Sequence, residues 1–202
     1  MNRGDGEQIV QFLHEAEKLK SILRHSWLSS GRRESVAEHT WRMALMAMLL
    51  NKYLDKGVDL LKTLKLILVH DLVEINYKDN PAFKNQPKDK SHQEQKSLVK
   101  LTKGLPIKLG AELVKLWQEY QANKSPEARF AKALDKMEVL LQHNEAGLKF
   151  LTKKEYSFNL YHGLEQCEYD KFLKEFRQLI NDDFLRNYKK NKVDPRLYKK
   201  FL

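Results

Sequence analysis

The sequence predicts an all-α fold, an irregular bundle of helices. Apolar residues recur at spacings of three and four almost throughout the chain, which is the period of helices with one buried face. No segment shows the alternating, β-branched pattern that is typical of a strand. Glycine and proline are few, 8 and 5 among 202 residues, so helices can continue without interruption.

Two helices are expected in the first quarter of the chain. The first carries an apolar stripe over residues 9–23, and a polar loop around Gly31 follows it. The second opens at Ser35, whose hydroxyl can accept a hydrogen bond from the amide of Glu38, while the Glu38 carboxylate reaches back. This capping box predicts a helix that continues to about Leu54.

Four more helices are expected in the middle of the chain. Asp59 can cap the first of them and Ser125 the last, where Pro126 occupies the first turn and its missing amide is harmless. Proline-containing connections separate the helices. The expected ranges are 60–75, about 88–102, a segment that ends near 120, and a segment from 126 to at least 141.

A seventh helix is expected over residues 164–185, before a basic tail. The length of the chain fits a single domain, residues 1–202. We place its core at about residues 10–147. Residues 148–202 are interpreted as an addition that supplies the C-terminal helix and the tail.

Composition excludes several classes of protein. The single cysteine, Cys167, rules out an internal disulfide and a cysteine-based zinc cluster. The N-terminus has no apolar core of a signal peptide, and no apolar run approaches the ~18 residues of a membrane span. We therefore expect a cytoplasmic protein without a membrane segment. The net charge of +10 favours an anionic partner, although scattered lysine is more often a solvated surface.

Ionisable side chains interrupt the apolar helical stretches at three places. His39 lies in the second expected helix, His70 and Asp71 in the third, and Asp135 in the sixth. Burying a carboxylate is costly unless it is paired or bound to a metal. Each residue alone is more often a core histidine or a local salt bridge. Together they can share one divalent cation, and the nitrogen and oxygen donors suit Mn, Fe, Co, Ni or Mg.

The same side chains lie in segments that resemble the motifs of HD-domain phosphohydrolases. Residues 34–44 resemble the first motif, residues 68–74 the second, and residues 133–138 the third. The likeness covers about residues 10–145, and it is closest to the branch that contains the 5′-deoxynucleotidases. It implies that one divalent metal ion is held by His39, His70, Asp71 and Asp135.

Further roles implied by the resemblance concern catalysis and substrate binding. Glu74 and Asp79 would be the catalytic carboxylates, one orienting the attacking water and the other assisting the leaving alkoxide. Relatives often have glycine directly before the second acid, where this chain has Lys78, so the leaving-group preference stays open. The expected substrate-binding residues are Arg24, near the phosphate from the first helix, Trp27, near the sugar, and Asn80 and Pro81.

The activity implied is hydrolysis of (deoxy)nucleoside 5′-monophosphates to nucleoside and phosphate, by a homodimer. One alternative is an HD-superfamily hydrolase of a nucleoside triphosphate, an alarmone or a phosphodiester, which would use the same ligands. The other is a catalytically silent nucleic-acid-binding or interaction protein, suggested by the basic residues 188–192. Nucleic acid is the less favoured partner, because every expected ligand position is filled.

Overall fold

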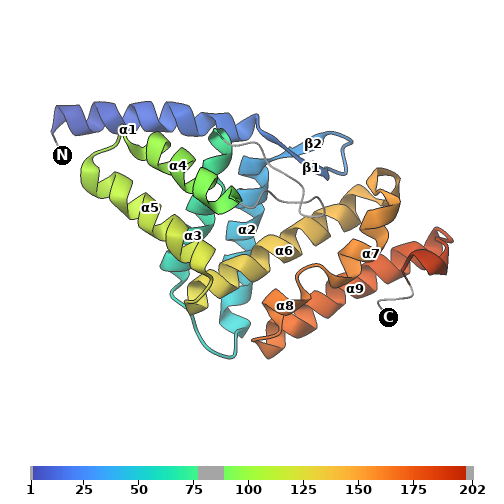
Figure 1. The fold of residues 1–202 in the computed structure, drawn as a ribbon. Helices are drawn as coiled ribbons and strands as arrows, with labels where there is room; N and C mark the ends of the chain where they lie inside the picture. Colours follow the sequence, from blue (N-terminus) through green and yellow to red (C-terminus); the bar gives the residue numbers. More distant parts are fainter. Residues whose placement is uncertain (1, 77–88, 199–202) are drawn as a thin grey trace.

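The computed structural model describes residues 2–76 and 89–198, and the prediction of an all-α fold is confirmed. Helices form most of the ribbon in Figure 1, with one small pair of strands. The α-helices are α1 (Arg3–Ala16), α2 (Val36–Leu50), α3 (Leu60–His70), α4 (Lys90–Thr102), α5 (Ile107–Ala122), α6 (Pro126–Ala146), α7 (Lys153–Tyr161), α8 (Leu164–Cys167) and α9 (Lys171–Lys190). Short 3-10 helices are η1 (Glu17–Lys20), η2 (Asn51–Tyr53), η3 (Leu72–Ile75), η4 (Leu148–Phe150) and η5 (Pro195–Leu197).

The predicted helix starts are confirmed at three positions. Ser35 and Glu38 form the capping box of α2, and the side chain of Asp59 accepts from the amide of Lys62 at the start of α3. Ser125 caps α6 in the same way, with proline in the first turn. These local hydrogen bonds satisfy amides that the helix itself leaves free.

The prediction that no strand occurs is wrong. β1 (Leu23–Trp27) starts at Leu23, the last residue of the expected first helix, and pairs antiparallel with β2 (Arg33–Ser35). The helical part ends earlier, at Ala16, and η1 leads into the hairpin. β1 lies against α6, so a tertiary contact, which a local apolar pattern does not reveal, selects the extended backbone.

The third helix is also shorter than predicted. α3 ends at His70, and Asp71 adopts φ −104° and ψ 8°, between α-helical and extended backbone. η3 continues the chain, so Glu74 follows a break and does not lie one helical turn beyond His70 on the same helix. Asp71 and the η3 residues therefore lie just beyond the C-terminal end of α3.

Helix α6 is the centre of the packing. It contacts α2, α3, α5, α9 and β1, and Figure 1 shows it running between α2 and α3 on one side and α7 to α9 on the other. Its buried stripe consists of Phe130, Leu134, Met137 and Leu140. Each such side chain contributes about 1.5–3 kcal/mol when it is buried. The helix therefore gives a rigid base for the polar side chains that it carries.

In the described part of the C-terminal segment, the α-helices α7, α8 and α9 occur where one helix was predicted at 164–185. Gly163 has φ 78°, and a Cβ there would lie 2.5 Å from Cβ of Lys136, so the chain can turn between α7 and α8 close to α6. Phe184 and Tyr188 of α9 belong to the same hydrophobic cluster as Leu134 and Met137. Among the described residues, no helix combines the length and apolar character that crossing a bilayer demands. The cytoplasmic location stays a prediction.

Candidate metal centre and adjoining cleft

Two buried histidines direct their Nε2 atoms toward one point between α2, α3 and α6. Nδ1 of His39 forms a hydrogen bond with the Glu138 carboxylate. Nδ1 of His70 donates a hydrogen bond to the carbonyl oxygen of Ile67 at 2.6 Å. Neither Nε2 atom makes a hydrogen bond of good geometry within the described part of the chain. A ring whose Nδ1 carries the donated proton has its lone pair on Nε2. Both rings are thus oriented as ligands.

Two carboxylates lie beside these nitrogen atoms. Oδ1 of Asp135 is 3.3 Å from Nε2 of His39, and Oδ2 of Asp71 is 3.1 Å from Nε2 of His70. Ligand atoms of His39, His70 and Asp135 all lie within 4.8 Å of one another. The structure therefore brings the four predicted ligands together, and the orphaned Nε2 atoms with two carboxylates fit a divalent metal ion.

Neighbouring charges keep both carboxylates ionised. Burial alone would raise the pKa of Asp71, but His70 and Arg24 outweigh it and hold that pKa below its usual range. Burial also opposes ionisation of Asp135, where Lys136, at 2.7 Å from Oδ2, helps to lower the pKa well below its usual range. Deprotonated carboxylates are the form that binds a metal.

Arg24 reaches this group from strand β1, so the prediction that it lies on the first helix is wrong. Its Nη1 is 3.3 Å from Oδ2 of Asp71, and its Nε is 3.4 Å from Oε2 of Glu34. The side chain is 9% exposed. The hairpin thereby holds a guanidinium beside a predicted metal ligand.

A cleft of about 510 Å³ opens next to the four predicted ligands. Its wall carries equal numbers of basic and acidic side chains, Arg24, Lys90, Lys132 and Lys136 against Asp71, Glu74, Glu94 and Asp135. The lining among the described residues comprises Arg24, His25, His70, Asp71, Val73, Glu74, Lys90, Ser91, Glu94, Tyr120, Gln121, Lys132, Asp135, Lys136, Val139, Phe158 and His162.

Trp27, which was predicted to lie near the sugar of the substrate, packs away from this cleft. Trp27 stacks on Phe150, with ring centroids 4.7 Å apart, and the guanidinium of Arg33 lies over the Trp27 ring, 4.5 Å from its centre. Trp27 is not among the described residues that line the cleft. Asp79, Asn80 and Pro81 lie outside the described residues.

Sequence reasoning assigned no role to Glu138, which is fully buried behind His39. Its other carboxylate oxygen accepts a hydrogen bond from Nε of Arg42 at 2.7 Å. Burial opposes its ionisation, but His39 and Arg42 outweigh that and lower the pKa of Glu138 to about 2. Its position three residues after Asp135 was the available signal, because such residues share one face of a helix.

Comparison with known proteins identifies the family. Residues 16–177 match a family model described as the HD domain. The chain belongs to the HD-domain family. The match of the HD domain extends past residue 147, the predicted limit of the core, and into α9.

Relatives of this HD-domain chain cover most of its length. The human protein 5′-deoxynucleotidase HDDC2 is 37% identical over 140 residues, 68% of this chain and 67% of that protein. The Schizosaccharomyces pombe protein 5′-deoxynucleotidase hdd1 is 34% identical over 164 residues, 78% of this chain and 81% of that protein. A crystal structure described as a predicted metal-dependent phosphohydrolase from Magnetospirillum magnetotacticum has a TM-score of 0.76 and 34% identity, and covers 90% of this chain and 93% of that one.

Proposed function

We propose that the chain is a metal-dependent phosphohydrolase that converts (deoxy)nucleoside 5′-monophosphates to nucleoside and phosphate. The convergence of two histidines and two aspartates beside a cleft that carries Arg24 and three lysines is the observation that supports the proposal most directly. The names of the human and fission yeast relatives support the substrate class.

One divalent ion, Mn, Co, Fe, Ni or Mg, would be held by the four converging side chains. When bound there, a divalent ion polarises a phosphoryl oxygen and lowers the pKa of a water molecule. His39 and His70 would bind through Nε2, because Glu138 and Ile67 engage the opposite nitrogen of each ring. Asp71 and Asp135 would complete the set.

Cationic side chains of the cleft would bind the phosphate. The guanidinium of Arg24 lies 3.3 Å from Oδ2 of Asp71, and its planar N–H donors are of the kind that recognises phosphate oxygens. Lys132 was not singled out from the sequence. Its ammonium lies 4.0 Å from the ring centre of Tyr120, and no carboxylate of the described residues is within ion-pair distance. Burial lowers the pKa of Lys132 to about 8, so most of it is charged at pH 7.

Proton transfer would fall to carboxylates outside the metal set. Glu74 lies on the cleft wall, where its carboxylate can orient a water or protonate a leaving alkoxide. Asp79 is the predicted second acid of the pair. Its role, and the substrate contacts of Trp27, Asn80 and Pro81, stay predictions.

A panel of phosphorylated compounds tests the proposed substrate. We expect phosphate release from deoxynucleoside 5′-monophosphates in the presence of Mn²⁺ or Co²⁺, and little from triphosphates, a guanosine alarmone or a phosphodiester. The reason is that the four basic side chains of the described cleft are matched by four acidic ones, which leaves little positive charge to neutralise a triphosphate. Phosphate is measured colorimetrically, with Asp135→Ala as the inactive control. Turnover of triphosphates or diesters alone would replace the proposed substrate class, and salt-sensitive nucleic-acid binding without turnover would favour the silent alternative.

We also propose that the protein is a homodimer that uses the outer face of α2. Trp41, Leu45, Met48 and Leu49 share this face at helical spacing, and Trp41 is 65% exposed. A contiguous apolar surface of this kind is typical of a protein interface. Sedimentation should show a dimer for the wild type and a monomer for Met48→Glu. Leu179→Glu, at an exposed leucine of α9, is the control. A monomeric wild type would contradict the proposal.

A further inference from the structure

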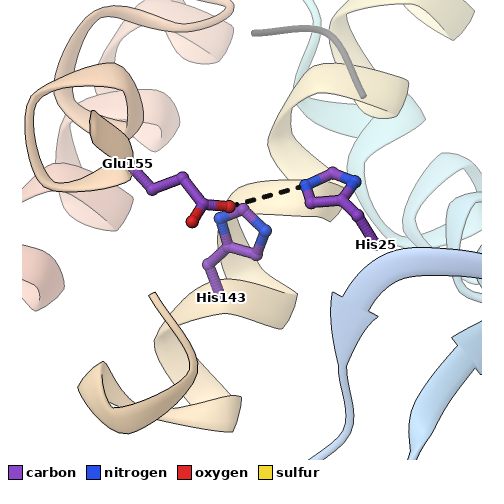
Figure 2. A group of neighbouring side chains, drawn as sticks. All are labelled: His25, His143 and Glu155. Atoms are coloured by element: carbon purple, nitrogen blue, oxygen red, sulfur yellow. Dashed lines mark ion pairs between the residues drawn. The ribbon is translucent and has the colours of Figure 1, made fainter. Parts of the chain in front are cut away.

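A second group of metal-binding side chain types lies outside the four predicted ligands. His25 comes from β1, His143 from α6 and Glu155 from α7, and Figure 2 shows the three side chains gathered around one space. Their potential ligand atoms all lie within 4.8 Å of one another. No residue is shared with the group of His39, His70 and Asp135.

The spacing in this second group suits a shared cation. Nε2 of His25 is 3.8 Å from Oε1 of Glu155, which is longer than a hydrogen bond. Because Zn²⁺ binds nitrogen and oxygen at about 2.0–2.2 Å in tetrahedral geometry, two ligands of one ion lie roughly 3.3–3.6 Å apart. The observed separation of 3.8 Å is slightly longer, so a small movement would allow both atoms to bind one ion.

Hydrogen bonds orient two of the three side chains. Nδ1 of His143 lies 2.9 Å from Oδ1 of Asn159 and donates to it, which leaves Nε2 as an acceptor. The Ser26 hydroxyl donates to that Nε2 atom over 3.4 Å, a long contact that a bound metal ion would replace. Oε2 of Glu155 accepts from both the amide and the hydroxyl of Thr152, each at 2.7 Å. Oε1 is thereby left facing His25, and such outer contacts are typical of metal ligands.

The burial of the three side chains favours a bound cation. His143 is 3% exposed and Glu155 is 4% exposed. A buried carboxylate without a cationic partner is costly, and the neighbouring rings supply nitrogen donors. Two imidazoles and one carboxylate are a donor set that Zn²⁺ uses with an open fourth position, whereas Mg²⁺ prefers oxygen donors only.

We propose that His25, His143 and Glu155 form a second metal site, selective for a Zn²⁺-like transition metal and separate from the HD-domain ligand group. Bound there, the ion would connect β1, α6 and α7. Because Arg24 precedes His25 on β1, the site would also fix the strand that presents Arg24 to the cleft. Its role would be structural, since two of its three ligands do not line the cleft.

Zinc stoichiometry of the full-length protein tests this site. Chelator-stripped protein is dialysed against Zn²⁺, and bound metal is measured by mass spectrometry. We expect two equivalents for the wild type and one for both His25→Ala and Glu155→Gln. Glutamine at 155 can still accept from Thr152, so the start of α7 is preserved. His14→Ala, at an exposed histidine of α1, should keep two equivalents.

A variant without the HD-domain ligand group distinguishes zinc at the second site from zinc at the first. His39→Ala/Asp135→Ala should retain one equivalent, and addition of His25→Ala should remove it. Loss of all bound zinc from His39→Ala/Asp135→Ala, or wild-type zinc content in both His25→Ala and Glu155→Gln, would overturn the proposal. Circular dichroism identifies any variant that fails to fold, and His25→Ala, at a partly exposed strand position, provides the test if Glu155→Gln does not fold. Since metal content is the readout, failure of the proposed hydrolase activity would not affect the result.

Discussion

Replacing Asp71 with alanine is expected to lower kcat for nucleoside monophosphate hydrolysis by about 10³-fold or more, because a metal ligand and its charge are both lost. Asp71 lies 3.1 Å from Nε2 of His70 and 3.3 Å from Arg24. Its removal therefore disturbs the ligand group and the guanidinium together. The side chain ends at the cleft and supports no helix cap, so the helical circular dichroism should stay close to that of the wild type.

A matched aspartate controls this experiment. Asp183 lies on the exposed side of α9, where it pairs with Arg186 on its own helix, and Asp183→Ala should keep the wild-type rate. Asp71→Asn adds a further comparison, since it retains the shape and loses the charge. Wild-type kcat in Asp71→Ala would contradict the assignment of the metal ligands, whereas a loss of ellipticity would indicate a fold defect.

The four proposed ligands were predicted from the resemblance of three segments to HD-domain motifs, and these residues also interrupt apolar helical stretches. His70 and Asp71 interrupt an apolar helix, and Asp135 interrupts the stripe of α6. Such conflicts are costly without a compensating partner, so they point to a shared one. Periodicity also located α2 to α6 correctly to within a few residues, apart from the longer run predicted for α3.

The hairpin and α7 could not be predicted from the same reasoning. β1 contains only five residues, and its extended backbone depends on pairing with β2 and contact with α6. α7 buries Glu155 and Asn159 as well as apolar side chains. Their burial follows from polar contacts with His143 and its neighbours, which an apolar stripe does not record. Both features depend on contacts between residues distant in the sequence.

Replacing Glu138 with alanine is expected to weaken the fold and metal binding at once. The variant would leave Arg42 and His39 without their shared buried partner, which typically costs about 3–5 kcal/mol of the free energy of unfolding. The His39 ring would also lose the contact that fixes its orientation, and outer contacts of this kind contribute about 10–100-fold to metal affinity. Urea unfolding and metal titration measure the two effects separately.

Glu145 offers a matched control on the same helix, because it also pairs with Arg42. Its side chain is 55% exposed, whereas that of Glu138 is fully buried. An exposed ion pair contributes only about 0–1 kcal/mol, so Glu145→Ala should unfold close to the wild type and bind metal normally. Equal behaviour of the two variants would contradict a supporting role for Glu138. A large loss confined to Glu138→Ala would mean that the metal site depends on the buried carboxylate behind His39 as well as on the ligands themselves.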